Sequence, residues 1–471
     1  MIARTKIVAT IGPASQDVAV LSKLLQAGAN VFRVNFSHGT YEEHAKSLAN
    51  IAAASQAVGK PVAVLADLCG PKIRVGKVVA GGVELREGAE IVIQRETVEG
   101  DASRISTTLP EMIDNVHPGE CIMIDDGKMR LEVTTVNAPV SFTCRVTRGG
   151  KLSSGKGINL PHTNLALSAL TEKDRRDVAW IAARPDIDYV ALSFVQNPAD
   201  IHELRALLQQ HGKTLPIVAK IEKPQALACI EEIVQTVDAV MVARGDLGVE
   251  MELPSVPLAQ KRIVRLCQRA GKPCIVATQM LESMIDAATP TRAEVCDIAN
   301  AVIDQTDAVM LSGETAIGKY PVEAVTMMHE TIAATETWHD DHDAAVPDGN
   351  GSTGAIVAAV RAITRQEKVA AVAVYTASGA TARVLSKSRL HTPILAVSPD
   401  ASMVRRVCLY YGVAPVCHNA PEHTRDVLTI AQRVALANGL AKSGDKLLVV
   451  SGRPIGKPGT TNTIVLHTVT K

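Results

Sequence analysis

Aromatic side chains are scarce in this chain: they make up 3% of its 471 residues and include only two tryptophans. A core must therefore be built from Val, Ala, Ile and Leu, which form continuous runs in buried parallel strands. Apolar residues still reach 46%, and this excludes a largely disordered chain. The length exceeds what one hydrophobic core supports, so we expect two to four domains.

Net charge, paired cysteines and long apolar runs are also missing. The 49 basic residues balance the 49 acidic ones, which argues against a nucleic-acid partner or an anionic membrane surface. The nine cysteines contain no Cys-x-x-Cys pair, a pattern typical of reduced thiols in the cytosol. No run is long enough to span a bilayer, and the first residues contain no apolar signal region. We therefore expect a soluble, cytoplasmic protein.

Eight short apolar runs, each followed by a polar residue, recur along the first two thirds of the chain. They are residues 7–9, 31–34, 62–66, 190–192, 217–219, 239–243, 275–277 and 308–311. Helix-like stretches separate most of them. One is predicted to run from a cap at Ser15 to Gly28, and another begins at the capping-box pair Thr291 and Glu294. This alternation predicts an α/β protein with a closed (β/α)8 TIM barrel.

Residues 70–166 interrupt the alternation with short, β-forming segments separated by glycine-containing turns. They predict a small all-β domain, a β-barrel lid inserted after the third barrel strand. Without this insertion, residues 1–69 and 167–337 have about the length of such a barrel, roughly 250 residues. Residues 353–471 alternate helices and strands again and predict a C-terminal open-sheet α/β domain. The polar stretch after Trp338 is interpreted as a linker, in preference to a metal site built from its His and Asp residues.

Polar residues gather at the predicted C-terminal ends of the barrel strands, where barrels of this class carry their active sites. They are Arg33, Asn35, Ser37, Asp67, Lys220, Glu222, Arg244, Asp246, Thr278 and Glu314. Glu222 and Asp246 follow adjacent strands, and two carboxylates completed by substrate oxygens suit magnesium. Lys220 shares a face with Glu222, because side chains two positions apart in a strand point the same way. A lysine there indicates an anionic substrate; a structural Lys–Glu ion pair is the alternative.

Two further segments have features of anion-binding loops. In residues 150–157, Gly157 stands where a phosphate-binding loop has the Ser or Thr that holds magnesium, and no helix follows. Lys156 either reaches a nucleotide phosphate from the lid or belongs to a plain turn. Residues 376–381 follow a predicted strand and open a helix, which favours phosphate, although helix capping explains the same residues. The glycine-rich loop 453–459 is expected to close over them.

The chain closely resembles the pyruvate kinase family over essentially its whole length. The resemblance rests on separated motifs at residues 5–13 (TKIVATIGP), 33–39 (RVNFSHG), 70–74 (GPKIR), 219–222 (AKIE), 243–248 (ARGDLG), 277–280 (ATQM) and 311–315 (LSGET). It implies glycolytic transfer of a phosphoryl group from phosphoenolpyruvate to ADP, giving pyruvate and ATP. It also implies two magnesium ions per active site in turnover, regulation by a phosphorylated small molecule, and a homotetramer.

The same resemblance implies roles for individual residues. Magnesium would be held by Glu222 and Asp246, and the catalytic residues would be Lys220, Thr278 and Arg33. Phosphoenolpyruvate would be contacted by Arg33, Lys220, Gly245, Asp246 and Thr278, and the nucleotide by Arg74, Lys156, His38 and Asn35. The effector would be bound by Thr376, Ser378, Gly379, Thr381 and Arg453. Relatives often have a charged residue and an Arg where this chain has Ala377 and Ala380, which leaves the identity of the effector open.

One departure from the family concerns potassium. Relatives that require this ion hold it with residues matching Asn35, Ser37, Asp67 and the backbone at Leu68, and many have Glu where this chain has Lys72. An ammonium group at that position would compete with a like-charged ion. We therefore expect that potassium is not required, or activates only weakly.

Two other functions stay open on the sequence alone. A magnesium-dependent pyruvate-enolate lyase or aldolase on a related barrel would use Glu222 and Asp246, but it would not explain Lys156 on a lid or the C-terminal domain. A degenerate kinase kept for binding would be expected to lack Lys220 or a metal carboxylate, and none of these is missing. Pyruvate formation from phosphoenolpyruvate that depends on ADP and magnesium distinguishes the three.

Overall fold

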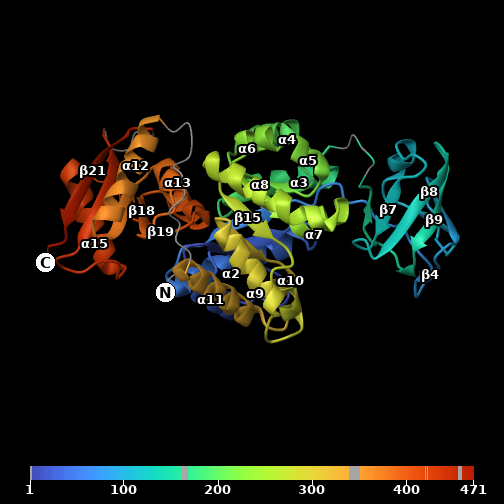
Figure 1. Ribbon diagram of the computed structural model, residues 1–471, viewed down its shortest axis with the longest axis horizontal. Coiled ribbons are helices and arrows are strands. Elements are labelled where there is room, and N and C mark those ends of the chain that lie inside the picture. The colour runs from blue at the N-terminus through green and yellow to red at the C-terminus, as the bar shows by residue number, and fades with distance from the viewer. Residues whose placement is uncertain are drawn as a thin grey trace.

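A computed structural model describes residues 3–161, 163, 165, 168–338, 351–419, 421, 423–453 and 459–470. Three parts lie in a row (Figure 1): the C-terminal domain, a central barrel and an all-β domain at the opposite end. The predicted linker at 339–350 and most of the loop 453–459 lie outside the described residues. None of the helices in the described ranges is long and apolar enough to cross a membrane.

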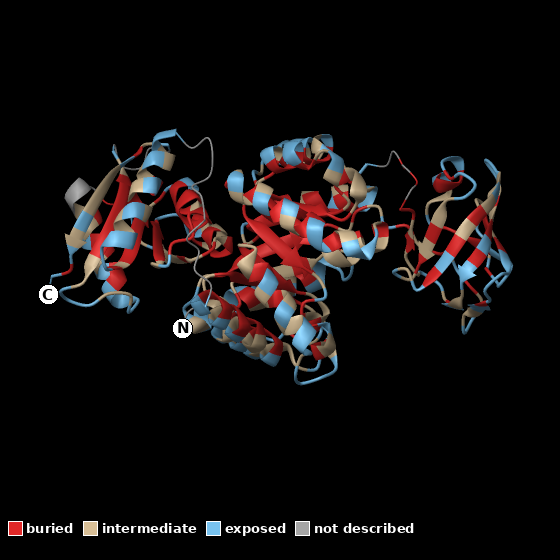
Figure 2. Cartoon of the chain, viewed as in Figure 1, coloured by how far each residue is buried: buried red, intermediate tan, exposed pale blue. Residues whose placement is uncertain are grey.

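Eight parallel strands close the central barrel in the order β1-β16-β15-β14-β13-β12-β3-β2. They are β1 (Lys6–Thr10), β2 (Val31–Asn35), β3 (Ala63–Asp67), β12 (Tyr189–Leu192), β13 (Ile217–Ile221), β14 (Ala239–Ala243), β15 (Cys274–Ala277) and β16 (Ala308–Leu311). The strands are buried along nearly their whole length (Figure 2), because one face fills the barrel and the other packs against helices. The predicted TIM barrel is confirmed, with a strand at each of the eight runs.

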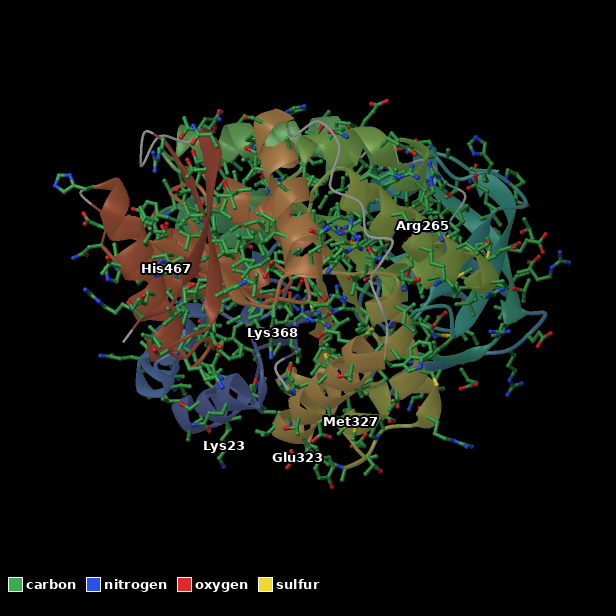
Figure 3. The ribbon with its side chains drawn as sticks, turned by 60° about the vertical axis from the view of Figure 1, so that its left-hand side comes forward. Lys23, Arg265, Glu323, Met327, Lys368 and His467 are labelled. Carbon is green, nitrogen blue, oxygen red and sulfur yellow. The ribbon has the colours of Figure 1, made fainter. Side chains whose placement is uncertain are left out.

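Helices cover the outside of the barrel. They are α1 (Val18–Ala27), α2 (Tyr41–Val58), α3 (Glu172–Ala182), α4 (Pro198–Gln210), α5 (Pro224–Ala228), α6 (Ile230–Thr236), α7 (Arg244–Glu250), α8 (Val256–Arg269), α9 (Arg292–Ile303), α10 (Gly313–Ala316) and α11 (Pro321–Trp338). Helices α1 and α11 pack together; Lys23 marks the first in Figure 3, and Glu323 and Met327 mark the second.

The two predicted helix starts differ in outcome. Thr291 and Glu294 form the expected capping box of α9. The cap predicted at Ser15 is wrong, because Asp17 accepts a hydrogen bond from the Ala19 N–H and caps α1. Ser15 is fully buried, and its hydroxyl instead accepts from the Gly12 N–H at 3.3 Å. The predicted end at Gly28 is correct: this glycine has φ 125° and follows the last helical residue.

The inserted domain is all-β, as predicted. Its strands are β4 (Val83–Leu85), β5 (Glu90–Gln94), β6 (Arg104–Ser106), β7 (Cys121–Ile124), β8 (Met129–Asn137), β9 (Ser141–Arg148), β10 (Gly150–Leu152) and β11 (Ile158–Asn159). They form a six-stranded sheet, β11-β7-β8-β9-β5-β6, and a two-stranded sheet, β10-β4. The expected β-barrel is thus not closed by strand pairing among the described residues. Strands of two or three residues, such as β6 and β11, are too short to complete a ring of ladders.

The C-terminal domain is an open α/β sheet with the order β19-β18-β17-β20-β21. Its elements are α12 (Gly351–Gln366), β17 (Val369–Tyr375), α13 (Ala380–Lys387), β18 (Ile394–Ser398), α14 (Ala401–Arg406), β19 (Val413–Cys417), α15 (Thr424–Ala437), β20 (Lys446–Gly452) and β21 (Thr461–Thr468). Cys408 and Leu409, in the short turn after α14, belong to the same apolar cluster as the barrel-lining residues Val8 and Tyr189. This domain therefore covers the N-terminal floor of the barrel and leaves the C-terminal rim to the lid.

Candidate active site at the rim of the barrel

Lys220 lies at the centre of the rim. Its Nζ is 2.8 Å from Glu222 Oε1, 2.7 Å from Ser193 Oγ and 3.4 Å from Asp67 Oδ1. These oxygens follow or end the neighbouring strands β13, β12 and β3. Burial lowers the pKa of Lys220, but the carboxylates of Asp67 and Glu222 outweigh it and leave the pKa above its ordinary value. The ammonium is therefore a fixed, permanently charged group.

Arg33 supplies a second cation beside Lys220. Its Nε lies 2.6 Å from Asp67 Oδ2, and its Nη1 donates to Thr10 Oγ1 at 3.1 Å. Burial raises the pKa of Asp67, yet Lys220 and Arg33 overcome this and lower the pKa below its usual value. Asp67 Oδ1 is buried and makes no hydrogen bond within the described part of the chain. One acceptor in this cluster thus keeps capacity for a further ligand.

Two carboxylates face the rim from adjacent strands. Glu222 is 1% exposed; its Oε2 accepts from the Phe194 N–H at 2.8 Å, and each of its oxygens keeps a lone pair. Asp246 lies in the first turn of α7, directly after β14. Burial raises the pKa of Glu222, Lys220 opposes that rise, and the charge of Asp246 adds to it. The two carboxylates are close enough to repel each other.

This donor set fits magnesium. In the ranges that the structure describes, no group of three or more His, Cys, Asp or Glu residues is arranged to hold a metal. The protein then supplies at most two carboxylates. Magnesium is commonly bound by one or two carboxylates and takes its remaining ligands from water and substrate oxygens.

Thr278, at the end of β15, has a strained backbone, with φ 71°, followed by Gln279 with φ 55°. β-branched residues rarely adopt this conformation, and such strain gathers at functional sites. The Thr278 hydroxyl accepts from the Gly245 N–H at 2.7 Å and donates to Ala277 O at 2.6 Å. Thr278 and the start of α7 therefore lie side by side on the rim.

Two members of the predicted rim set do not join this cluster. Arg244 donates to Thr278 O and to Asp297 Oδ1, both at 2.7 Å, and so braces β15 and α9. Glu314 is fully buried and accepts from the N–H groups of Leu281 and Ser312. The polar groups of both side chains are occupied by hydrogen bonds within the protein, so we assign both residues structural roles.

The predicted nucleotide residues come from two places. His38 is exposed in the loop after β2, where Asn35 Oδ1 accepts from the Ser37 N–H at 3.0 Å. Arg74 and Lys156 belong to the lid: Arg74 Nη1 donates to Gly155 O at 2.8 Å, and Lys156 Nζ lies 2.9 Å from Asp125 Oδ1. No hydrogen bond or ion pair in the described part of the chain joins the two groups, and the lid lysine is paired within its own domain.

The potassium-site positions lie on neighbouring strands, with Asn35 of β2 opposite Asp67 of β3. Leu68 is buried, and its carbonyl accepts from Ser193 Oγ at 2.8 Å. Lys72 is exposed and lines a cavity of about 30 Å³ between lid and barrel, together with Asp246 and Glu250. No hydrogen bond or ion pair among the described residues joins Lys72 to the potassium-site positions.

The predicted effector loop leads into α13, and among its described residues no side chain forms a cap hydrogen bond with the helix. Thr376 Oγ1 accepts from the Gly379 N–H at 2.9 Å, and Gly379 has φ 75°. The hydroxyls of Thr381 and Thr461 lie 2.6 Å apart, which ties the helix start to β21. Ser378 and Arg453 are both exposed. These hydrogen bonds occupy the hydroxyls of the buried Thr376 and Thr381, while Ser378 and Arg453 keep side chains available to a ligand.

Sequence reasoning missed Ser193 and Phe194 as rim residues. Ser193 Oγ accepts a hydrogen bond from the Lys220 ammonium. The Phe194 N–H, on a residue with φ 56°, donates to the Glu222 carboxylate. Ser193 was the first polar residue after a predicted strand, the same signal that identified Asp67. A backbone donor such as the Phe194 N–H has no signal in the sequence.

Comparison with known proteins gives consistent matches along the chain. A family model described as "Pyruvate kinase, barrel domain" matches residues 2–325, and one described as "Pyruvate kinase, alpha/beta domain" matches residues 354–467. A pyruvate kinase from Geobacillus stearothermophilus is 43% identical, covering 99% of this chain and 80% of that protein. One from Corynebacterium efficiens is 40% identical, covering 98% and 97% respectively. A crystal structure of a pyruvate kinase from Cryptosporidium parvum aligns with TM-score 0.93 at 33% identity, over 99% of this chain and 96% of that one.

Proposed function

From the premise that this chain belongs to the pyruvate kinase family, we propose which of its residues carry out phosphoryl transfer from phosphoenolpyruvate to ADP. The observation that supports the assignment best is the Lys220 ammonium, fixed by Glu222, Ser193 and Asp67 at the barrel rim. Phosphoryl transfer needs positioning and charge neutralisation more than covalent chemistry, and a preorganised cation supplies both. A lyase or aldolase is not favoured, because both matching family models are pyruvate kinase domains.

In this proposal some rim residues bind the metal and others bind the substrate. Glu222 and Asp246 hold magnesium, which the family uses and which neutralises charge on the phosphoryl group when bound. Lys220 stabilises the transferring phosphoryl group and the enolate that is left behind, and Arg33 binds the phosphate. The substrate carboxylate is held by the backbone at Gly245 and Asp246 and by the Thr278 hydroxyl. Their mutual hydrogen bond supports this, since it places these groups at one point of the rim.

The nucleotide is proposed to bind between the β2 loop and the lid. Asn35 and His38 lie on the barrel side, Arg74 and Lys156 on the lid side, and a second magnesium accompanies the phosphates. Lys156 must exchange Asp125 for a phosphate oxygen when the lid closes. Closure would also exclude water from the enolate and the phosphoryl group.

Potassium is proposed to be dispensable. The basis for this proposal is the positive charge of Lys72 next to the barrel rim. Its side chain lines the cavity between lid and barrel together with Asp246. Rates in potassium are expected to match those measured with a bulky organic cation in its place. Strong activation by potassium would contradict the assignment.

Regulation and assembly are carried over from the family as further proposals. A sugar phosphate or nucleotide is proposed to bind at Thr376, Ser378, Gly379, Thr381 and Arg453; a Thr381→Ala, Arg453→Ala variant should lose activation by it. A homotetramer is supported by two exposed leucines, Leu253 just before α8 and Leu258 within it, which are 71% and 69% exposed, and by the edge strand β21. We also propose a cytoplasmic location and domains spanning 1–69 with 167–337, 70–166, and 353–471.

One assay tests the function as a whole. Purified chain is incubated with phosphoenolpyruvate, and pyruvate is measured with ADP or magnesium omitted in turn. We expect pyruvate only when both are present, with ATP formed in equal amount. Pyruvate without ADP would identify a lyase or phosphatase, and no turnover under any condition would favour a binding protein.

A further inference from the structure

Helix α3, the first helix after the lid, touches both the lid hinge and the loop after β2. Asp174 is fully buried, and its Oδ1 accepts from the Gly70 N–H at 3.2 Å, where the chain enters the lid. One residue earlier, Lys173 Nζ donates to Phe36 O at 2.6 Å. The entrance to the lid and the loop after β2 are therefore attached to the same turn of one helix.

The Phe36 contact fixes the loop that carries Asn35, Ser37 and His38. The Phe36 N–H donates to Asp67 O at 2.9 Å, and its carbonyl accepts from Lys173, so both sides of this residue are held. The next N–H, of Ser37, donates to Asn35 Oδ1 at 3.0 Å. These bonds set the direction of the backbone that presents the exposed His38.

Lys173 is itself held in place by an ion pair within α3. Its Nζ lies 2.6 Å from Asp177 Oδ2, and the side chain of Asp177 is 2% exposed. Asp177 Oδ1 also accepts from Tyr41 Oη at 2.9 Å, and the Tyr41 ring stacks on Trp180 with centroids 5.4 Å apart. The Phe36 ring in turn stacks on the His44 ring, with centroids 4.3 Å apart. Aromatic residues make up only 3% of this chain, yet several of their rings pack against the loop after β2. We interpret this cluster of rings as a rigid support for the loop.

We propose that Lys173 and Asp177 are positioning residues for the nucleotide: they hold the Asn35–His38 loop in its binding conformation and connect it through α3 to the lid hinge. They touch neither the reacting phosphoryl group nor the metal carboxylates. The inference rests on the proposed placement of the nucleotide at Asn35 and His38. It assigns a function to a lysine and an aspartate outside the rim cluster.

Steady-state kinetics of the full chain test the role of Lys173. Lys173→Met should raise the KM for ADP by about tenfold, because a charge-assisted hydrogen bond to the loop is lost. The kcat and the KM for phosphoenolpyruvate should stay unchanged, and Lys173→Arg, which keeps a donor, should restore the KM for ADP. Arg175→Met is the matched control: Arg175 lies on the same helix, is 37% exposed against 45% for Lys173, and pairs with Glu203. An equal effect in Arg175→Met would overturn the proposal.

Fluorescence gives a second measurement that does not depend on turnover. In a Trp338→Phe background the only tryptophan is Trp180, whose ring packs against Tyr41. Magnesium–ADP without phosphoenolpyruvate should change its emission in a saturable way, and Lys173→Met should move the midpoint to higher ADP. An unchanged midpoint would contradict the role of Lys173.

His38→Ala separates this inference from the function on which it rests. If His38→Ala raises the KM for ADP and Lys173→Met does not, the loop binds nucleotide but Lys173 does not position it, and the inference is wrong. If neither variant raises the KM for ADP, the nucleotide does not bind at this loop, and the placement itself fails. Effects in both variants, with Arg175→Met unchanged, support the inference.

Discussion

The two ends of the barrel carry buried ion clusters built from the same residue types. At the rim, Asp67 lies between Arg33 and Lys220, and both cations keep 11–12% of their side chains exposed. At the floor, Asp307 lies between Lys387 and Arg389, with every partner 1% exposed. Composition therefore does not distinguish an active site from a structural ion pair. The two clusters differ in their access to solvent and in whether the central carboxylate keeps an acceptor without a hydrogen bond.

The carboxylate of the floor cluster is more fully bonded than the carboxylate of the rim cluster, and in the floor cluster the buried atom without a hydrogen bond among the described residues is a donor, Arg389 Nε. Asp307 Oδ2 accepts from Lys387 Nζ at 2.5 Å and from the Cys274 N–H at 2.7 Å, while Oδ1 accepts from Arg389 at 3.2 Å. At the rim, Asp67 Oδ1 has no hydrogen bond in the described ranges. The C-terminal domain covers the floor, whereas the rim faces the lid. We infer that the floor cluster joins two domains and that the rim cluster acts on substrate.

The largest expected effect is on catalysis at the rim. Glu222→Gln should lower kcat by about 10³-fold, because one magnesium carboxylate loses its charge. The thermal unfolding midpoint should fall only modestly: the amide oxygen keeps one of the two donors, Lys220 or the Phe194 N–H, and Lys220 keeps Asp67 and Ser193. Pyruvate formation across a magnesium titration, with unfolding of the same samples, measures both. Activity close to that of the parent chain would remove Glu222 from the metal site.

At the floor the same kind of change should act on stability. Asp307→Asn leaves Lys387 and Arg389 buried without a compensating charge, and should cost about 3–5 kcal/mol of unfolding free energy. The kcat of the chain that remains folded should be close to that of the parent. Urea unfolding followed by circular dichroism, with kcat per folded molecule, provides the comparison. A stable Asp307→Asn chain would show that the floor cluster is dispensable.

Sequence alone predicted the barrel and the rim but not the floor. Buried parallel strands leave continuous apolar runs, and two of them, 239–243 and 308–311, match β14 and β16 residue for residue. Lys220 and Glu222 were paired correctly, because a two-residue spacing fixes their common face. Lys387 and Asp307 are 80 residues apart and meet only through domain packing. No local pattern records such a contact, and the same holds for Phe194 at the rim.

A buried carboxyl group at the floor should make the stability of the folded chain depend on pH. Asp188, at the floor, is fully buried, and burial raises its pKa to about 6 despite the Arg405 guanidinium at 3.0 Å. The folded chain thus holds this proton more tightly than the unfolded chain, whose Asp has a pKa of about 3.9. The stabilisation is present below pH about 4 and is lost as pH rises through about 6, by up to roughly 3 kcal/mol.

Unfolding free energies of the parent chain and Asp188→Asn, measured between those two pH values, test this dependence. The parent should lose stability with rising pH. The Asn variant, which has no proton to release, should have a flatter profile. Identical slopes in the two chains would mean that Asp188 titrates as it does in the unfolded state.

The smallest expected effect concerns the monovalent cation at the rim. Lys72→Glu replaces an ammonium with a carboxylate beside the lid cavity, and should make the rate respond to potassium where the parent does not. Rates in potassium and in a bulky organic cation should be compared for both chains. A parent chain that already responds as strongly as the variant would show that Lys72 does not replace the ion.

The most direct test of the central claim uses one buried lysine from each end. Lys220→Met and Lys387→Met make the same substitution beside a buried aspartate, and kcat and the unfolding midpoint are measured for both. We predict that both variants lose stability, because each leaves a buried carboxylate without its lysine, but that only Lys220→Met loses kcat per folded molecule, by about 10³-fold. If Lys387→Met lowers kcat as much as Lys220→Met while it stays folded, the division between a catalytic rim and a structural floor is wrong.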